Sequence, residues 1–82
     1  MYILKTGVNI KRLEQFGYHK AIDDGCHECY RKDLEYTDYI AIYENGTILI
    51  DVEDFCGSSW SEFQEKMLSD LIKADLVEKV GE

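Results

Sequence analysis

Two short segments in the middle of the chain alternate between isoleucine and other residues. They read YIAIY over residues 39–43 and TILIDV over residues 47–52, with ENG between them. A three-residue hairpin loop that ends in a left-handed glycine pairs Ile42 with Ile48 and Ile40 with Ile50. We choose this register because it gathers the four isoleucines on one face, whereas a two-residue loop mixes apolar and charged residues on both faces. The pattern predicts an antiparallel hairpin with one apolar face.

A second hairpin is predicted upstream, in AIDDGCHE (residues 21–28). Asp-Asp-Gly again fits a three-residue loop between two apolar-bearing runs. This loop would place Ile22 opposite Cys26 and His19 opposite Cys29, with His27 on the same face as the latter pair.

Two segments have the pattern of helices. Residues 9–17, NIKRLEQFG, predict a short helix that is capped by Asn9 and stopped by Gly17. Farther along, Ser59 and Glu62 form a capping box, and apolar residues then recur every three or four positions up to Ile72. We expect this long helix to end near residues 74–75, and LVEKV to follow as an extended segment that can pair with YILK near the N-terminus.

These elements predict an α+β fold in the order β-α-β-β-β-β-α-β. We expect an antiparallel β-meander of about four main strands, packed against one long C-terminal helix, with a short N-terminal helix beside them. Residues 1–82 are expected to form a single small α+β domain, because no repeat or linker-like stretch interrupts them.

Seventeen acidic residues against nine basic ones give a net charge of −8. Direct binding to nucleic acid or anionic lipid needs a concentrated positive patch, so we expect neither. The acidity either keeps the protein soluble or complements a basic partner; an acidic nucleic-acid mimic is a special case of the second alternative. No apolar run approaches the roughly 18 residues of a membrane span, and a signal peptide is not recognisable, so we expect a cytoplasmic protein without membrane contact.

The segment CHEC raises the question of a metal or redox site. A zinc module could use Cys26, Cys29 and Cys56 with His27 or His19, because zinc takes four nitrogen or sulfur ligands. If CHECYR is a strand, however, Cys26 and Cys29 point to opposite faces. A redox motif would need its first cysteine at a helix N-terminus, which the pattern does not provide. We expect three free cysteines and no cofactor, with the zinc module as the alternative.

Recognisable catalytic sets are absent from the sequence. The glycines do not form a phosphate-binding pattern, and adjacent carboxylates such as Asp23 and Asp24 fit turns better than a paired acid and base. We therefore predict that the protein is not an enzyme.

The outer face of the central hairpin is the candidate binding surface. It would show Tyr39, Tyr43 and Leu49, edged by three acids, Asp38, Asp51 and Glu53. Aromatic side chains supply rigid contact area, and the acids would attract a basic partner. The alternative is that the N-terminal helix covers this face.

Three stretches resemble a family of short proteins encoded by phages and prophages of Gram-positive bacteria. They are LEQFGY, the tyrosine-rich hairpin with IAI and ILI, and the closing LIKADLVEKV, so the likeness runs from Leu13 to Val80 and rests on hydrophobic patterning. The resemblance implies an origin in a mobile element and a host or phage protein as partner, but carries no established activity. We expect a small acidic protein-binding protein, monomer or homodimer, that acts on a host macromolecule, for example as an anti-defence or host-takeover inhibitor.

Overall fold

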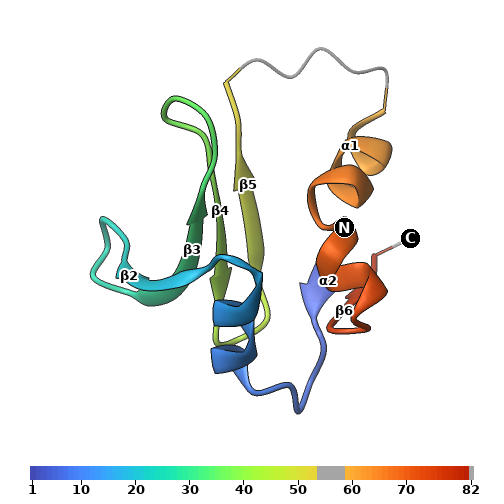
Figure 1. Ribbon diagram of the computed structural model, residues 1–82, viewed down its shortest axis with the longest axis horizontal. Coiled ribbons are helices and arrows are strands. Elements are labelled where there is room, and N and C mark those ends of the chain that lie inside the picture. Colours follow the sequence, from blue (N-terminus) through green and yellow to red (C-terminus); the bar gives the residue numbers. More distant parts are fainter. Residues whose placement is uncertain (54–58, 82) are drawn as a thin grey trace.

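The computed structural model describes residues 1–53 and 59–81 of the 82-residue chain. In chain order the elements are β1 (Tyr2–Leu4), the 3-10 helix η1 (Ile10–Phe16), β2 (His19–Ile22), β3 (Glu28–Asp33), β4 (Tyr39–Tyr43), β5 (Ile48–Asp51), α1 (Trp60–Met67), α2 (Ser69–Lys73) and β6 (Val77–Lys79). Strands β2 to β5 form a four-stranded antiparallel sheet in sequential order, and β1 pairs with β6 in a second, two-stranded sheet. The helices α1 and α2 and the β1–β6 pair lie on one side of the larger sheet (Figure 1). The α+β class and the antiparallel sheet of four strands are confirmed.

The β4–β5 hairpin has the predicted register. Ile40 lies opposite Ile50 and Ile42 opposite Ile48. Gly46 ends the three-residue loop in the left-handed region, at φ 96°. Its carbonyl accepts the N–H of Leu4 at 2.9 Å, and a Cβ at this position would lie 3.2 Å from the Leu4 carbonyl oxygen. The glycine therefore serves the turn and also lets β1 approach the larger sheet.

The predicted register of the β2–β3 hairpin is wrong by two residues. Ala21 lies opposite Cys29, and His19 lies opposite Arg31 rather than Cys29. The N–H of Asp23 donates to the His27 carbonyl at 2.9 Å, so the loop comprises residues 24–26. Its left-handed residue is Cys26, at φ 64°, and not the neighbouring glycine.

The side chain of Asp23 accounts for this shift. Its Oδ1 atom accepts the N–H groups of Gly25 at 2.9 Å and of His27 at 2.8 Å. An aspartate that bonds to the backbone two and four residues ahead builds its own turn. That turn fixes Asp23 as the last residue before the loop. The left-handed conformation therefore does not fall on the glycine, where the prediction placed it.

The predicted long C-terminal helix is also wrong. Two short helices, α1 of 8 residues and α2 of 5 residues, meet at Leu68, whose backbone lies at φ −104° and ψ 14°. Next to this break, the Asp70 carboxylate accepts the N–H of Leu71 at 2.8 Å. Short polar side chains compete in this way for backbone groups that would otherwise extend a helix. The apolar periodicity spans the break, because Leu68 and Leu71 are both fully buried.

The predicted ends of the helices are confirmed. The Asn9 side chain accepts the N–H of Lys11 at 3.0 Å, and Gly17 closes η1 at φ 93°. The Ser59 hydroxyl accepts the N–H of Glu62 at 3.2 Å and caps α1. Asp75, at φ 63°, follows α2 and leads into β6, which pairs with β1 as expected.

The core lies between the isoleucine face of the sheet and the other elements. Its fully buried side chains are Leu13, Ile40, Ile42, Leu68, Leu71 and Leu76. Tyr18 is buried with them, and its hydroxyl has no hydrogen-bond partner within the described residues. No helix in residues 1–53 and 59–81 has the length and apolar character needed to cross a membrane.

Candidate functional site

The sheet face opposite the core contains a hollow of about 380 Å³. Strand alternation turns Tyr39, Ala41 and Tyr43 of β4 to this face, since Ile40 and Ile42 between them are in the core. Neighbouring strands continue the face across the sheet. The residues that line the hollow are Ala21, Ile22, Asp23, Asp24, Gly25, Cys29, Arg31, Tyr39, Ala41, Tyr43 and Leu49. We call this feature the tyrosine hollow.

Small side chains form the floor of the tyrosine hollow. Ala41 is 2% exposed and Cys29 is 4% exposed, although both belong to the face that points away from the core. The larger lining side chains, among them Arg31, Tyr39 and Tyr43, surround them. Burial raises the pKa of the Cys29 thiol, which favours its neutral form.

One wall of the hollow is a stacked pair. The guanidinium carbon of Arg31 lies 4.0 Å from the centroid of the Tyr39 ring, and Arg31 Nε donates to Asp33 at 2.9 Å. The second carboxylate oxygen of Asp33 is 3.2 Å from His19 Nε2. Hydrogen bonds from His19 and Arg31 lower the pKa of Asp33, whereas burial and the Asp51 carboxylate raise the pKa of Tyr39. The Arg31 guanidinium is therefore already paired with a carboxylate.

The opposite wall is held by Tyr43 and Asp23. The Tyr43 hydroxyl donates to Asp23 Oδ2 at 2.9 Å and joins β4 to the residue that precedes the β2–β3 loop. This bond, followed by burial, raises the pKa of Tyr43 to about 12. The hydrogen bond from the His27 backbone N–H is the main cause of the lowered pKa of Asp23. Burial, the next largest effect, opposes it, and the Tyr43 hydroxyl adds to the lowering. Asp23 is therefore a carboxylate with most of its hydrogen-bonding capacity in use.

The N-terminal helix does not cover this face. Leu13 of η1 is fully buried in the core cluster with Ile40 and Ile42, and Ile10 and Phe16 pack against the same cluster. All residues that line the hollow belong to strands β2 to β5 or to the loop after β2. The alternative in which residues 9–16 cover the tyrosines is wrong.

The predicted surface residues separate into two groups. Tyr39, Tyr43 and Leu49 line the hollow, Leu49 with 42% of its surface exposed, and Asp51 lies opposite Tyr39. Asp38 and Glu53 lie beyond the strand ends, where the Asp38 carboxylate accepts the N–H of Glu53 at 3.1 Å. Thr37 also donates to Glu53 at 3.3 Å. These two acids are close to each other but do not line the hollow.

Most residues that line the hollow were not part of the predicted binding surface. Asp23 was read only as a turn residue, Cys29 was considered only for the zinc module, and Arg31 and Ala41 were not assigned to a site. The β3–β4 register, with Arg31 opposite Ala41 and Cys29 opposite Tyr43, brings them to the tyrosine face. Strand parity puts Arg31 and Cys29 on the outer face only once that register is known, and the sequence does not assign it.

The described residues of the alternative zinc module do not form one cluster. Cys26 is exposed in the loop, Cys29 is buried in the hollow floor, and Cys56 lies outside the described residues. His27 Nδ1 is 3.4 Å from Asp23, and His19 contacts Asp33. Within residues 1–53 and 59–81, no three His, Cys, Asp or Glu side chains form a group that could hold a metal ion.

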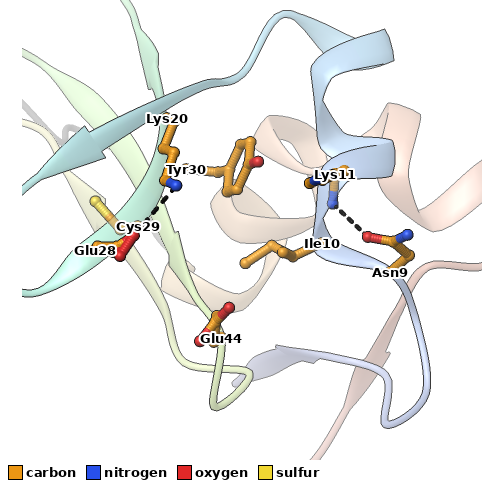
Figure 2. A pocket seen from close by; sticks show the side chains of 8 residues that line it. All are labelled: Asn9, Ile10, Lys11, Lys20, Glu28, Cys29, Tyr30 and Glu44. Carbon is orange, nitrogen blue, oxygen red and sulfur yellow. Dashed lines mark hydrogen bonds and ion pairs between the residues drawn. The ribbon is translucent and has the colours of Figure 1, made fainter.

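A smaller hollow of about 180 Å³ lies between η1 and the β2–β3 hairpin (Figure 2). Ile10 and Tyr30 form its apolar sides, and the Lys20 ammonium lies 3.3 Å from Glu28 at its rim. Both side chains of this ion pair are more than half exposed. The pair is therefore a surface contact.

The described residues of the tyrosine hollow offer aromatic area, two phenol hydroxyls and nearby carboxylates. Tyr39 and Tyr43 stay protonated at neutral pH, because the ordinary pKa of a tyrosine is 10.0 and both are raised further. Asp23 stays ionised and hydrogen-bonded. Such a set suits recognition of a side chain that is long and positively charged. Comparisons of the chain with protein-family models, with curated proteins and with solved structures found no match.

Proposed function

We propose that the protein is a small protein-binding module that holds a basic segment of a partner in the tyrosine hollow. The observation that carries the proposal is a hollow of about 380 Å³ with tyrosine walls, on the sheet face that the core elements leave open. Small ligand sites in proteins are concave and combine apolar walls with a few placed polar groups, and this hollow has that composition.

The chemistry of the rim favours a cationic side chain. Asp23, Asp24 and Asp51 lie in or beside the hollow, while its own cation, Arg31, is paired with Asp33. An aliphatic stem of lysine or arginine could lie between Tyr39 and Leu49, and its charged end would meet these carboxylates. The net charge of −8 would in addition draw a basic protein toward the chain.

The resemblance to phage and prophage proteins supports the choice of target. It favours a host macromolecule, and in this proposal the partner is a host protein with an exposed basic segment. Occupation of that segment would block its normal use, which is how an anti-defence or host-takeover inhibitor acts. The module needs no cofactor and performs no reaction in this proposal.

The test is photo-crosslinking inside a Gram-positive bacterial host. The chain is produced with p-benzoyl-phenylalanine at Leu49, in the hollow, or at Tyr36, which is 94% exposed and lies outside it. We expect a discrete protein adduct from position 49 and none from position 36. Tyr39→Ser in the same chain should remove the adduct, whereas Tyr36→Ser in the chain labelled at position 49 should leave it unchanged.

Two results would overturn the proposal. One is the lack of a discrete adduct from position 49 in chains that fold, as judged by circular dichroism. The other is an adduct that survives Tyr39→Ser, because a partner that binds through the hollow must lose its main aromatic contact in that variant.

A further inference from the structure

Strands β3 and β5 present related residues on the two sides of Tyr39. On one side, β3 sets Asp33 opposite Tyr39, and Arg31 lies two residues before it on the same face. On the other side, β5 sets Asp51 opposite the same tyrosine, and Leu49 lies two residues before it on the same face. Each strand therefore places a carboxylate beside Tyr39, and β5 has a leucine at the position where β3 has an arginine.

The β3 side shows how this face holds a guanidinium. The guanidinium carbon of Arg31 lies 4.0 Å from the centroid of the Tyr39 ring, and its Nε atom donates to Asp33 at 2.9 Å. One planar group thus stacks on the ring and binds the carboxylate beside it. A guanidinium can make both contacts because it is flat and carries its donors in one plane.

The β5 side has the carboxylate without the cation. Asp51 is exposed, and it takes part in none of the ion pairs found within residues 1–53 and 59–81. After burial, its carboxylate is the main cause of the raised pKa of Tyr39, so it lies close to the Tyr39 hydroxyl. Because Arg31 covers the ring face toward β3, the ring face toward β5 adjoins Leu49 and Asp51.

We propose that the side chain held in the tyrosine hollow is an arginine, whose guanidinium stacks on the β5-facing side of the Tyr39 ring and donates two hydrogen bonds to Asp51. This inference rests on the proposed function and names the residue type that the partner presents. The aliphatic stem of the arginine packs on Leu49. The partner then supplies on the β5 side the group that Arg31 supplies on the β3 side.

A lysine fits this position less well. Its ammonium group is a compact charge that neither stacks flat on a ring nor binds both oxygens of one carboxylate in a plane. The floor of the hollow consists of the buried side chains of Ala41 and Cys29, which favours the more weakly hydrated guanidinium. Repulsion from Arg31 is offset, because Asp33 already neutralises its charge. The hollow should therefore distinguish between the two basic residues as well as attract positive charge.

The test is an NMR titration of the full chain with two capped synthetic peptides, Gly-Ser-Arg-Ser-Gly and Gly-Ser-Lys-Ser-Gly. We expect the arginine peptide to shift the backbone amides of Tyr39, Leu49 and Asp51. Its dissociation constant should be on the order of 1 mM, and at least about fivefold lower than that of the lysine peptide.

Asp51→Asn keeps the size of the side chain and removes its charge. In this variant the dissociation constant of the arginine peptide should rise to within about twofold of that of the lysine peptide. Glu35→Gln is the matched control, since Glu35 is exposed in the β3–β4 turn and both replacements change the net charge of the chain from −8 to −7. The control should keep the preference for arginine, and the same spectra show whether each variant is folded.

Three results would overturn the choice of arginine: equal affinity for the two peptides, a preference that survives Asp51→Asn, or shifts that lie outside the hollow. Equal affinity with shifts in the hollow would leave the basic segment of the proposed function standing. If neither peptide shifts the hollow, the arginine contact is also wrong, and the crosslink from position 49 then decides on the basic segment by itself.

Discussion

At the scale of single residues, Asp23 decides the geometry of the hollow. Its carboxylate accepts two backbone N–H groups of the loop and the hydroxyl of Tyr43. The sequence gives no warning of this role, because Asp-Asp-Gly fits a standard loop in which the glycine takes the left-handed position. The aspartate turn is favoured because it satisfies two backbone donors at once. Cys26 then adopts the left-handed conformation in place of the glycine.

Two tyrosine hydroxyls allow a direct comparison of paired and unpaired groups. The Tyr18 hydroxyl is buried without a partner in the described residues, and Tyr43 donates to Asp23. Tyr18→Phe should leave the free energy of unfolding unchanged or raise it by up to about 1 kcal/mol, because an unsatisfied buried hydroxyl is costly. Tyr43→Phe should lower it. Urea denaturation of both variants checks the order, and a clear loss of stability in Tyr18→Phe would show that its hydroxyl is bonded.

The same bond predicts how stability responds to alkali. The pKa of Tyr43 is about 12 in the folded protein against an ordinary value of 10.0. Below 10.0 both states keep the proton, so the Tyr43 contribution is fully present. Between 10.0 and about 12 the unfolded chain loses the proton first, and the contribution is lost as pH rises.

The stability difference between the original chain and Tyr43→Phe should therefore shrink through this pH range. Urea midpoints measured for both chains at several pH values give that difference, and contributions from other tyrosines cancel in it. A difference that stays constant above 10.0 would contradict the Tyr43–Asp23 bond.

At the scale of elements, periodicity predicts which residues face the core better than it predicts where an element breaks. Leu68 and Leu71 are buried, as the apolar periodicity of this segment predicts, yet the backbone leaves the helical region at Leu68. A periodic pattern constrains side-chain direction, and a short break that preserves this direction leaves the pattern intact. Trp60 departs from this periodicity, because it is 44% exposed. Its ring stacks on that of Phe63, with the two centroids 5.4 Å apart.

The α2 helix carries a test of the core. Leu71 is fully buried in the cluster with Ile40 and Ile50, whereas Lys73 in the same helix is exposed. Leu71→Ala should lower the free energy of unfolding by about 2–4 kcal/mol, because it leaves a cavity, and Lys73→Ala should change it by less than about 0.5 kcal/mol. Urea denaturation measures both, and equal midpoints would contradict the position of α2.

At the scale of the whole molecule, the sequence predicts the sheet better than the site. Clean alternation at Ile40, Ile42, Ile48 and Ile50 predicts the central hairpin and its two faces correctly. The hollow, however, depends on the β3–β4 register and on a turn made by one carboxylate. Neither is encoded by a local pattern, so Tyr39, Tyr43 and Leu49 could be predicted but Asp23 and Arg31 could not.

The distribution of acids over the molecule leads to a prediction about the rate of partner binding. Asp38, Asp51 and Glu53 lie at the same end of the sheet as Tyr39, whereas Glu62, Glu65 and Glu78 are exposed on α1 and β6. Replacing either set with amides changes the net charge by the same amount, from −8 to −5. With the crosslinked partner in hand, the first set should slow association by about three- to tenfold at low salt and flatten its salt dependence, because charges near an interface mainly act on the association rate.

The second set should have a much smaller effect, since its charges lie farther from the hollow and are screened over about 10 Å at 0.1 M salt. Stopped-flow measurements of both variants over a range of salt concentrations provide the comparison. If the two sets slow association equally, the partner responds to the overall charge of the chain and not to the acids beside Tyr39. If only the first set slows association, the partner first meets the chain at the end of the sheet that carries Tyr39.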